Sequence, residues 1–326
     1  MAAAPIDPQT LSNVVALACR APSLHNSQPW RLIAEGGQLR LFVEPHRAPR
    51  ASDRSGREAL ISCGALLDHL RVAAAAAGWN AVVARFPNPN DLDHLATIDF
   101  HRTESITDAA RARADAILAR RTDRLPFAEP PGWPYIEAML RDAVDPDMAT
   151  LHVLPDSARP QLAEASRLTE SLRRYDTSYH AELQWWTAPF EVSDGVPSSS
   201  LASASERDRV DVARNFPLSG DGGRRPEVNR DHAVIAVLST EGGDRREALG
   251  CGEALSAVLL EATLAGLATC TLTHMTELQA SRAIIRALTG SPDDPQLLIR
   301  FGQVPTLEDS PPPTPRRPLA DVLTVR

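Results

Sequence analysis

Hydrophobic residues in the first third of the chain recur with helical spacing in some stretches and alternate with polar residues in others. The predicted helices cover residues 7–20, 57–77 and 105–120. The predicted strands cover residues 30–33, 39–43, 81–86 and 96–101. The stretch 57–77 is apolar on nearly every side, which predicts a buried helix. Gly36 and Gly37 mark a hairpin turn between the first two strands.

The remaining two thirds show the same mixture, with one interruption. The predicted helices cover residues 134–143, 159–186, 249–265 and 278–288. The predicted strands cover residues 150–154, 233–239 and 296–301. Residues 187–230 are rich in Pro, Gly, Ser and charge and lack periodicity, which is typical of a functional lid or of a disordered insertion. The pattern as a whole predicts an α+β fold.

A short repeat suggests that this fold occurs twice. The segment Cys63-Gly64-Ala65-Leu66-Leu67 is echoed by Cys251-Gly252-Glu253-Ala254-Leu255. Each copy opens an alanine-rich stretch that ends in glycine at the same distance, since 78 − 64 = 14 and 266 − 252 = 14. Alanine-rich helices ending in glycine are common, so chance is the alternative. We interpret the repeat as two half-domains, residues 1–115 and 116–326, packed about a pseudo-two-fold axis, the second with an insertion at 187–230.

Composition excludes several classes of function. The formal charge is −8, with 42 acidic and 34 basic residues, and all the basic residues are arginines. This balance argues against a nucleic-acid partner and favours a small-molecule one. The four cysteines are scattered, which argues against a zinc site or a disulfide framework. The chain shows no signal-peptide pattern, dinucleotide-binding glycine motif or membrane-spanning stretch free of charge, so we expect a cytoplasmic location.

The most specific signal is the run Ala21-Pro-Ser-Leu-His-Asn-Ser-Gln-Pro-Trp30. It is similar to the A-P-S-x-x-N-x-Q-P-W segment of the nitroreductase superfamily, and the Leu-His pair most resembles the Acg family of mycobacterial nitroreductase-like proteins. The resemblance implies a nitroreductase-like fold, a bound flavin mononucleotide (FMN), and flavin contacts from Pro22, Ser23, Leu24 and Asn26. The alternative is a well-capped turn that packs Trp30 into the core.

A second run, Arg120-Arg121-Thr122-Asp123-Arg124, resembles the R-R-S-x-R start of ordinary nitroreductases, displaced here to mid-chain. The resemblance implies that Arg120, Arg121 and Thr122 hold the phosphate and ribityl end of FMN. It also implies that Arg124 lies near flavin N1 and O2, where negative charge collects on reduction. Arginines can grip phosphate in a bidentate manner. A solvated surface cluster is the alternative.

Two further segments match positions of the same family. Thr273 and His274 follow the second repeat and match a loop whose backbone N–H faces flavin N5. The His274 side chain is equally consistent with a loop corner. Arg316 and Arg317 match a C-terminal basic pair that meets the FMN phosphate, with a free basic tail as the alternative.

Each half carries only part of the implied set, so we expect one composite FMN site per chain and a monomer. The favoured hypothesis is an FMN enzyme that passes electrons from NAD(P)H to a small acceptor, a nitroaromatic or a quinone, with the flavin carrying the chemistry. The alternative is an FMN-storage or redox-stress protein without turnover, in which residues 187–230 close over the flavin. Trp185, Trp186 and Phe190 are candidates to cover the ring. A protein without bound flavin is a third hypothesis.

Overall fold

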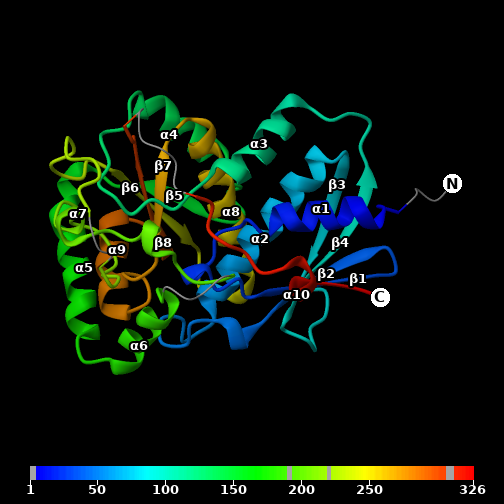
Figure 1. The fold of residues 1–326 in the computed structure, drawn as a ribbon, viewed down its shortest axis with the longest axis horizontal. Helices are drawn as coiled ribbons and strands as arrows, with labels where there is room; N and C mark the ends of the chain where they lie inside the picture. Colours follow the sequence, from blue (N-terminus) through cyan, green and yellow to red (C-terminus); the bar gives the residue numbers. More distant parts are fainter. Residues whose placement is uncertain (1–4, 189–192, 219–221, 306–311) are drawn as a thin grey trace.

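Two sheets lie on either side of a central pair of helices in the computed structural model, which describes residues 5–188, 193–218, 222–305 and 312–326 (Figure 1). The first sheet has the strand order β3-β4-β2-β1-β9 and the second the order β5-β6-β8-β7. The first sheet consists of β1 (Trp30–Glu35), β2 (Gln38–Val43), β3 (Trp79–Arg85), β4 (His94–Arg102) and β9 (Leu323–Val325). The second consists of β5 (Thr150–Val153), β6 (Val234–Thr240), β7 (Ala268–Leu272) and β8 (Asp294–Gly302).

The helices are α1 (Pro8–Ala18), α2 (Arg57–Ala76), α3 (Asp108–Ala119), α4 (Trp133–Asp142), α5 (Arg159–Arg173), α6 (Thr177–Trp186), α7 (Ala204–Arg207), α8 (Arg245–Leu264), α9 (Gln279–Thr289) and α10 (Leu319–Val322). Helices fill the space between the sheets, and α5 and α9 pack against the far face of the second sheet (Figure 1), whereas alternate residues of β3 in the first sheet are exposed. Local sequence explains several boundaries. Asp7 caps α1, and a capping box of Asp244 and Glu247 starts α8.

The repeated glycines are the point where α2 and α8 cross. A Cβ atom on Gly64 would lie 2.0 Å from the Leu249 carbonyl oxygen, and one on Gly252 would lie 2.0 Å from the Ile61 carbonyl oxygen. Gly64 corresponds to Gly252, and Ile61 to Leu249, because each pair is 188 residues apart in the sequence (252 − 64 = 188 and 249 − 61 = 188). The two contacts are therefore equivalent in the two halves. Side chains at these positions would force the backbones apart, so glycine is required on both helices. This reciprocal contact is the geometry that a pseudo-two-fold axis produces.

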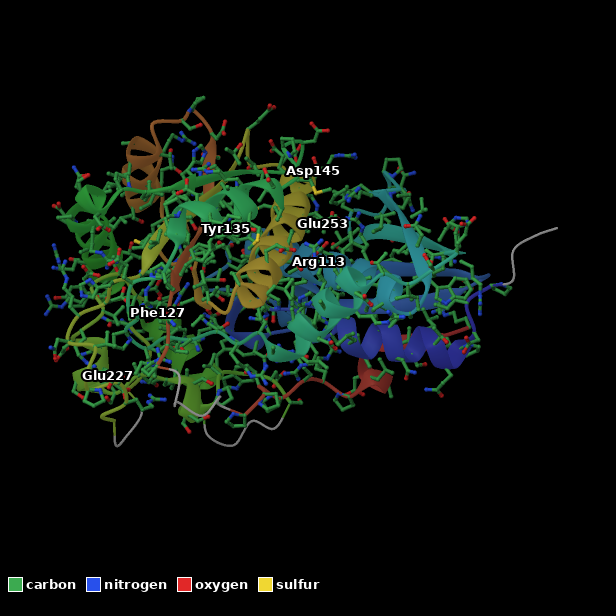
Figure 2. The ribbon with its side chains drawn as sticks, turned by 90° about the horizontal axis from the view of Figure 1, so that it is seen from above. Arg113, Phe127, Tyr135, Asp145, Glu227 and Glu253 are labelled. Carbon is green, nitrogen blue, oxygen red and sulfur yellow. The ribbon has the colours of Figure 1, made fainter. Side chains whose placement is uncertain are left out.

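The C-terminal segment belongs to the first sheet. Strand β9 pairs in parallel with β1, so that Leu32, Ile33 and Ala34 lie opposite Leu323, Thr324 and Val325. Residues at the end of the chain therefore complete the sheet that residues 30–102 begin, and the first half is not built from 1–115 alone. Figure 2 labels Glu253 of α8 between the two halves and Phe127 within the second half.

Most predicted elements are present, but the structure differs from the prediction in several places, among them the short helices α7 and α10, which were not predicted. The single helix expected over 159–186 is broken between α5 and α6, because Asp176 caps α6 through the Tyr179 N–H. Helix α8 begins earlier than predicted, and strands β7 and β9 were not predicted at all. Helix α2 is long and apolar enough to cross a membrane, but 83% of its most apolar window is buried inside the protein, as in ordinary core helices.

Candidate functional site

A large cavity lies where the two halves meet. The space between protein atoms there amounts to about 1090 Å³, counting the part that is open to solvent at its mouth. The first half contributes residues 22–25 and one side of α2, and the second half contributes residues 122 and 124, strands β7 and β8, and part of the 187–230 segment. A smaller polar pocket of about 540 Å³ adjoins it, and Pro22, Ser23, His25, Thr122 and Arg124 line both.

The segment after α1 enters the cavity with a strained backbone. His25, Asn26 and Gln28 have positive φ angles of 52°, 59° and 48°, which non-glycine residues seldom adopt. The strain is held by local hydrogen bonds, because the Ser23 hydroxyl accepts from the Gln28 N–H at 3.0 Å. Pro22, Ser23 and Leu24, for which the resemblance implies flavin contacts, line the cavity.

Asn26 lies in the smaller pocket and holds its walls together. Its amide nitrogen donates to the Gly195 and Pro315 carbonyls, both at 3.1 Å. Asn26 therefore joins three distant parts of the chain beside the cavity.

Arginines dominate the smaller pocket. It is lined by Arg20, Arg120, Arg121, Arg124 and Arg316. Arg120 is 7% exposed, and its Nε has no hydrogen-bond partner among the described residues. Burial and the neighbouring Arg121 and Arg20 lower the pKa of Arg120 to about 10. Within the described ranges no acidic side chain forms an ion pair with Arg20, Arg120 or Arg316, so this pocket has the charge of an anion-binding site.

Thr122 and Arg124 connect the arginine pocket to the larger cavity. Thr122 forms an isolated parallel bridge with Thr269 of β7, which holds this segment alongside the second sheet. The Arg124 guanidinium lies 4.9 Å from the centre of the Phe216 ring and donates to the Ser200 carbonyl at 3.3 Å. Burial lowers its pKa. An arginine in this position can stabilise negative charge developing in the cavity.

The loop after β7 meets the cavity through Thr273 but not through the side chain of His274. Thr273 lines the cavity, and its hydroxyl accepts from Arg214 at 2.9 Å. The His274 imidazole points to a separate cavity beside α5 and shares a 3.0 Å hydrogen bond with Ser166. Only the backbone of His274 remains a candidate for facing a ligand.

The two C-terminal arginines have different positions. The Arg316 guanidinium lines the arginine pocket, but it donates to the Cys19, Arg20 and Ala21 carbonyls at the end of α1. It adds positive charge to the pocket rather than free donors. Arg317 does not line the pocket, contrary to the sequence-based expectation, because its guanidinium pairs with Glu44 at 2.8 Å.

Residues 193–218 and 222–230, here called the covering segment, lie over both cavities. The larger cavity is lined by Ala202, Arg207, Val210, Ala213, Arg214, Phe216 and Leu218 of this segment, and the smaller one by Gly195, Val196, Pro197 and Ser200. Buried ion pairs join it to the rest of the protein, among them Arg214 with Glu277 and Arg225 with Asp123. Arg47 of the first half pairs with Asp194. The segment is thus fastened to both halves.

Several lining residues were missed from the sequence, and one expectation about aromatic residues was not met. Arg20, His25, Glu58, Phe216 and Arg300 line the site without having been predicted. Arg20 directly precedes the motif at 21–30 and His25 lies within it, so the motif could have indicated both residues. The other three reach the site only through folding. Trp186 packs 6.4 Å from the His25 ring rather than lining the cavity, Trp185 is half exposed, and Phe190 lies outside the described residues.

The donor set of the site suits an elongated ligand with an apolar planar part and an anionic end. In the part of the chain that the structure describes, no group of three or more His, Cys, Asp or Glu side chains is arranged to hold a metal ion. Burial, with Arg214 and Arg124 nearby, lowers the pKa of His25 well below its usual range, so its ring is neutral.

Comparison with known proteins gives close relatives along nearly the whole chain. A Mycobacterium tuberculosis protein named "Putative NAD(P)H nitroreductase acg" is 58% identical over 316 residues, which cover 97% of this chain and 96% of that protein. Another M. tuberculosis protein, also named as a putative NAD(P)H nitroreductase, is 38% identical over 325 residues, which cover 97% of this chain and 92% of that protein. No family model matches the chain.

Among solved structures, one described as a putative nitroreductase from Anabaena variabilis aligns with 90% of this chain and 88% of its own. The TM-score is 0.52 at 11% sequence identity, which supports the shared fold. The fold is therefore nitroreductase-like, with α+β architecture extending over both halves. Together with the 58% identity over nearly the full length, this shows that the chain belongs to the Acg family of nitroreductase-like proteins.

Proposed function

We propose that the protein binds one FMN per chain and uses it to pass electrons from NAD(P)H to a small acceptor such as a nitroaromatic or a quinone. The observation that carries the proposal is the buried Arg120, with an unpartnered Nε, in an arginine pocket that adjoins a large cavity. The phosphate of FMN would supply negative charge to Arg20, Arg120 and Arg316, and in FMN a polar ribityl chain joins that phosphate to the planar ring. The names of the relatives support NAD(P)H as the donor.

The residues fit such a ligand by position. Arg20, Arg120 and Arg121 would hold the phosphate, with Arg316 adding charge, and Ser23 and Thr122 lie where the two pockets join. Pro22, Leu24 and Thr273 would contact the ring, and Arg124 would stabilise negative charge beside it. FMN would supply hydride acceptance and donation, while the protein provides orientation, charge and shielding from water.

Titration of the flavin-free protein with FMN and riboflavin tests the cofactor. The two ligands share the ring and differ in the phosphate. Hydrogen bonds to charged groups contribute about 1.5–3 kcal/mol each, so two or more arginine contacts predict a preference for FMN of about 10²-fold or more. Equal affinities would contradict the assignment of the arginine pocket. Light scattering of the FMN-loaded protein tests the expected monomer.

A second function, FMN storage without turnover, is favoured by the covering segment. Phe216, Arg214 and Leu218 of this segment line the cavity that a nicotinamide ring would have to enter. Anaerobic mixing of the FMN-loaded protein with NADPH, and separately with NADH, distinguishes the two functions. Rapid loss of the oxidised-flavin absorbance supports the reductase. Bleaching by dithionite alone supports storage and rejects turnover.

A further inference from the structure

His25 lies at the junction of the larger cavity and the arginine pocket. It lines both spaces, although its side chain is almost fully buried. Two aromatic rings pack against its imidazole. The Phe216 ring stands edge-on, with 5.6 Å between the ring centres, and the Trp186 ring lies at 6.4 Å. An imidazole packed in this way has little freedom to rotate, so the fold sets the positions of its two nitrogens.

A chain of hydrogen bonds from α6 fixes the proton on this ring. Glu182 accepts from the N–H groups of Ala51 and Ser52 at 2.8 and 2.9 Å, and from the Ser52 hydroxyl at 2.7 Å. The Ser52 hydroxyl therefore uses its one hydrogen on Glu182. The Ser52 oxygen can only accept from His25 Nε2, which lies 3.3 Å away. It follows that Nε2 carries a proton.

The other ring nitrogen, Nδ1, is left as a hydrogen-bond acceptor. It has no partner among the described residues, yet it is not sealed inside the protein as both ring nitrogens of His69 are. Burial and the nearby Arg214 and Arg124 lower the pKa of His25, so the ring is neutral. In a neutral ring with its proton on Nε2, the Nδ1 lone pair is free. A ligand atom that reaches Nδ1 must therefore be a donor.

The position of His25 indicates which donor of FMN reaches it. FMN carries two kinds of donor, the hydroxyls of the ribityl chain and the N3–H of the ring. With the phosphate among the arginines and the ring in the larger cavity, the ribityl chain passes through the junction that His25 lines. The Ser23 oxygen at this junction already accepts from the Gln28 N–H, and Arg124 can only donate. His25 thus supplies an acceptor where hydroxyl groups need one.

We propose that His25 Nδ1 accepts a hydrogen bond from a ribityl hydroxyl of FMN, and that Ser52 and Glu182 are positioning residues that keep this nitrogen unprotonated. The inference rests on the proposed FMN binding but not on turnover. His25 and Ser52 belong to the first half and Glu182 to the second, so packing of α6 against residues 51 and 52 prepares the cofactor site. The competing interpretation is a histidine that only fills space between Phe216 and Trp186.

Riboflavin and lumiflavin distinguish the two interpretations. They share the flavin ring with its N3–H and lack the phosphate, but lumiflavin has a methyl group in place of the ribityl chain. Ser52→Ala removes the hydroxyl that holds the Nε2 proton and keeps both N–H groups that bind Glu182. Ser55→Ala is the matched control, because Ser55 is an exposed serine of the same loop. His25→Asn removes the imidazole but keeps a residue type that tolerates a positive φ angle.

Affinities of the flavin-free, full-length proteins are measured by flavin fluorescence. We expect riboflavin to bind about threefold to tenfold more weakly to Ser52→Ala and His25→Asn, with lumiflavin unchanged and Ser55→Ala equal to the wild type. Equal losses for both flavins would show that His25 acts by packing or meets the ring, and would overturn the proposal. Unchanged riboflavin affinity in either variant would overturn it as well.

Nitrogen NMR of protein labelled at histidine tests the positioning role directly. The His25 signals, identified by their absence in His25→Asn, should show only the Nε2–H form in the wild type and both neutral forms in Ser52→Ala. A protonated Nδ1 in the wild type would contradict the proposal. Failure of the proposed function has different signs. A wild type that binds no FMN rejects the cofactor, and one that binds FMN but is not bleached by NADPH rejects only turnover, whereas the riboflavin-to-lumiflavin comparison decides the role of His25.

Discussion

Replacing Gly64 with alanine should destabilise the whole protein by driving the two central helices apart. The added Cβ would lie 2.0 Å from the Leu249 carbonyl oxygen and 2.9 Å from the Gly252 Cα, and both neighbours are backbone atoms that cannot rotate away. An ordinary carbon–oxygen contact needs more than 3 Å, so α8 must move by about 1 Å or α2 must bend. Either change loosens the packing on both sides of the crossing.

Overpacking in a core costs about 1–3 kcal/mol, and a clash of backbone against backbone belongs at the upper end. Alanine returns about 1 kcal/mol through its better helix propensity. We therefore expect a net loss of about 2 kcal/mol or more, which lowers the melting temperature by about 4–8 °C. Ile61, Ser62 and Leu255 line the large cavity on either side of the crossing, so FMN affinity should fall as well.

Thermal and urea unfolding of Gly64→Ala and Gly252→Ala measure this, with Gly250→Ala as the control. Gly250 lies on α8, like Gly252, but a Cβ atom added there would meet Met148 at an ordinary 3.5 Å. The Gly250→Ala variant should therefore be as stable as the wild type or slightly more stable. The two crossing variants should lose similar amounts, because their contacts are reciprocal. A Gly64→Ala protein as stable as Gly250→Ala would refute the reasoning.

Three further predictions concern the site. Arg120→Gln should weaken FMN binding by about 10–100-fold and leave riboflavin binding unchanged, whereas Arg317→Gln should affect FMN little, as measured by flavin fluorescence titration. Glu277→Gln removes the partner of Arg214 and should speed limited proteolysis of the covering segment, and an unchanged cleavage rate would count against its anchoring role. Burial and the adjacent Glu58 charge raise the pKa of Asp53 to about 8, so the folded state binds a proton that the unfolded state releases, and stability should fall from pH 5 to 8 by up to about 1.4 kcal/mol per unit. Urea melts of Asp53→Asn should lack this slope.

Local patterning was sufficient for most helices and strands. Asp7 and the period of Leu11, Val14 and Val15 predict α1, and Gly36 and Gly37 predict the turn between β1 and β2. The break between α5 and α6 was missed because helical spacing continues through it, while a single Asp176 cap decides the boundary. Strand β9 has only three residues and owes its existence to β1, so no local signal predicts it.

The residues of the candidate site likewise fall into those that sequence motifs indicate and those that only tertiary contacts place there. Ser23 belongs to one motif and Arg120 and Thr122 to another, and folding brings the two motifs to one pocket. Contiguity fixes the geometry within each motif, whereas their meeting was expected only from the resemblance to the family. The His274 side chain and the Arg317 guanidinium lie elsewhere. His274 is in a turn and Arg317 in an irregular segment, where the sequence does not say which of two neighbouring residues faces the pocket. Phe216 and Arg300 reach the cavity through long-range packing, which one sequence cannot reveal.

The parallel pairing of β9 with β1 has a consequence for biosynthesis. Residues 30–35 leave the ribosome early, but their partner strand at 323–325 is made much later, so the first sheet stays open at one edge until that strand has been synthesised. The residues shortly before β9 include Pro315, whose carbonyl accepts a hydrogen bond from Asn26, and Arg316, which donates to the Arg20 carbonyl after α1. A nascent chain that has not reached residue 316 therefore lacks part of the arginine pocket, and a chain that stops before residue 323 should be prone to pair its open edge with another chain.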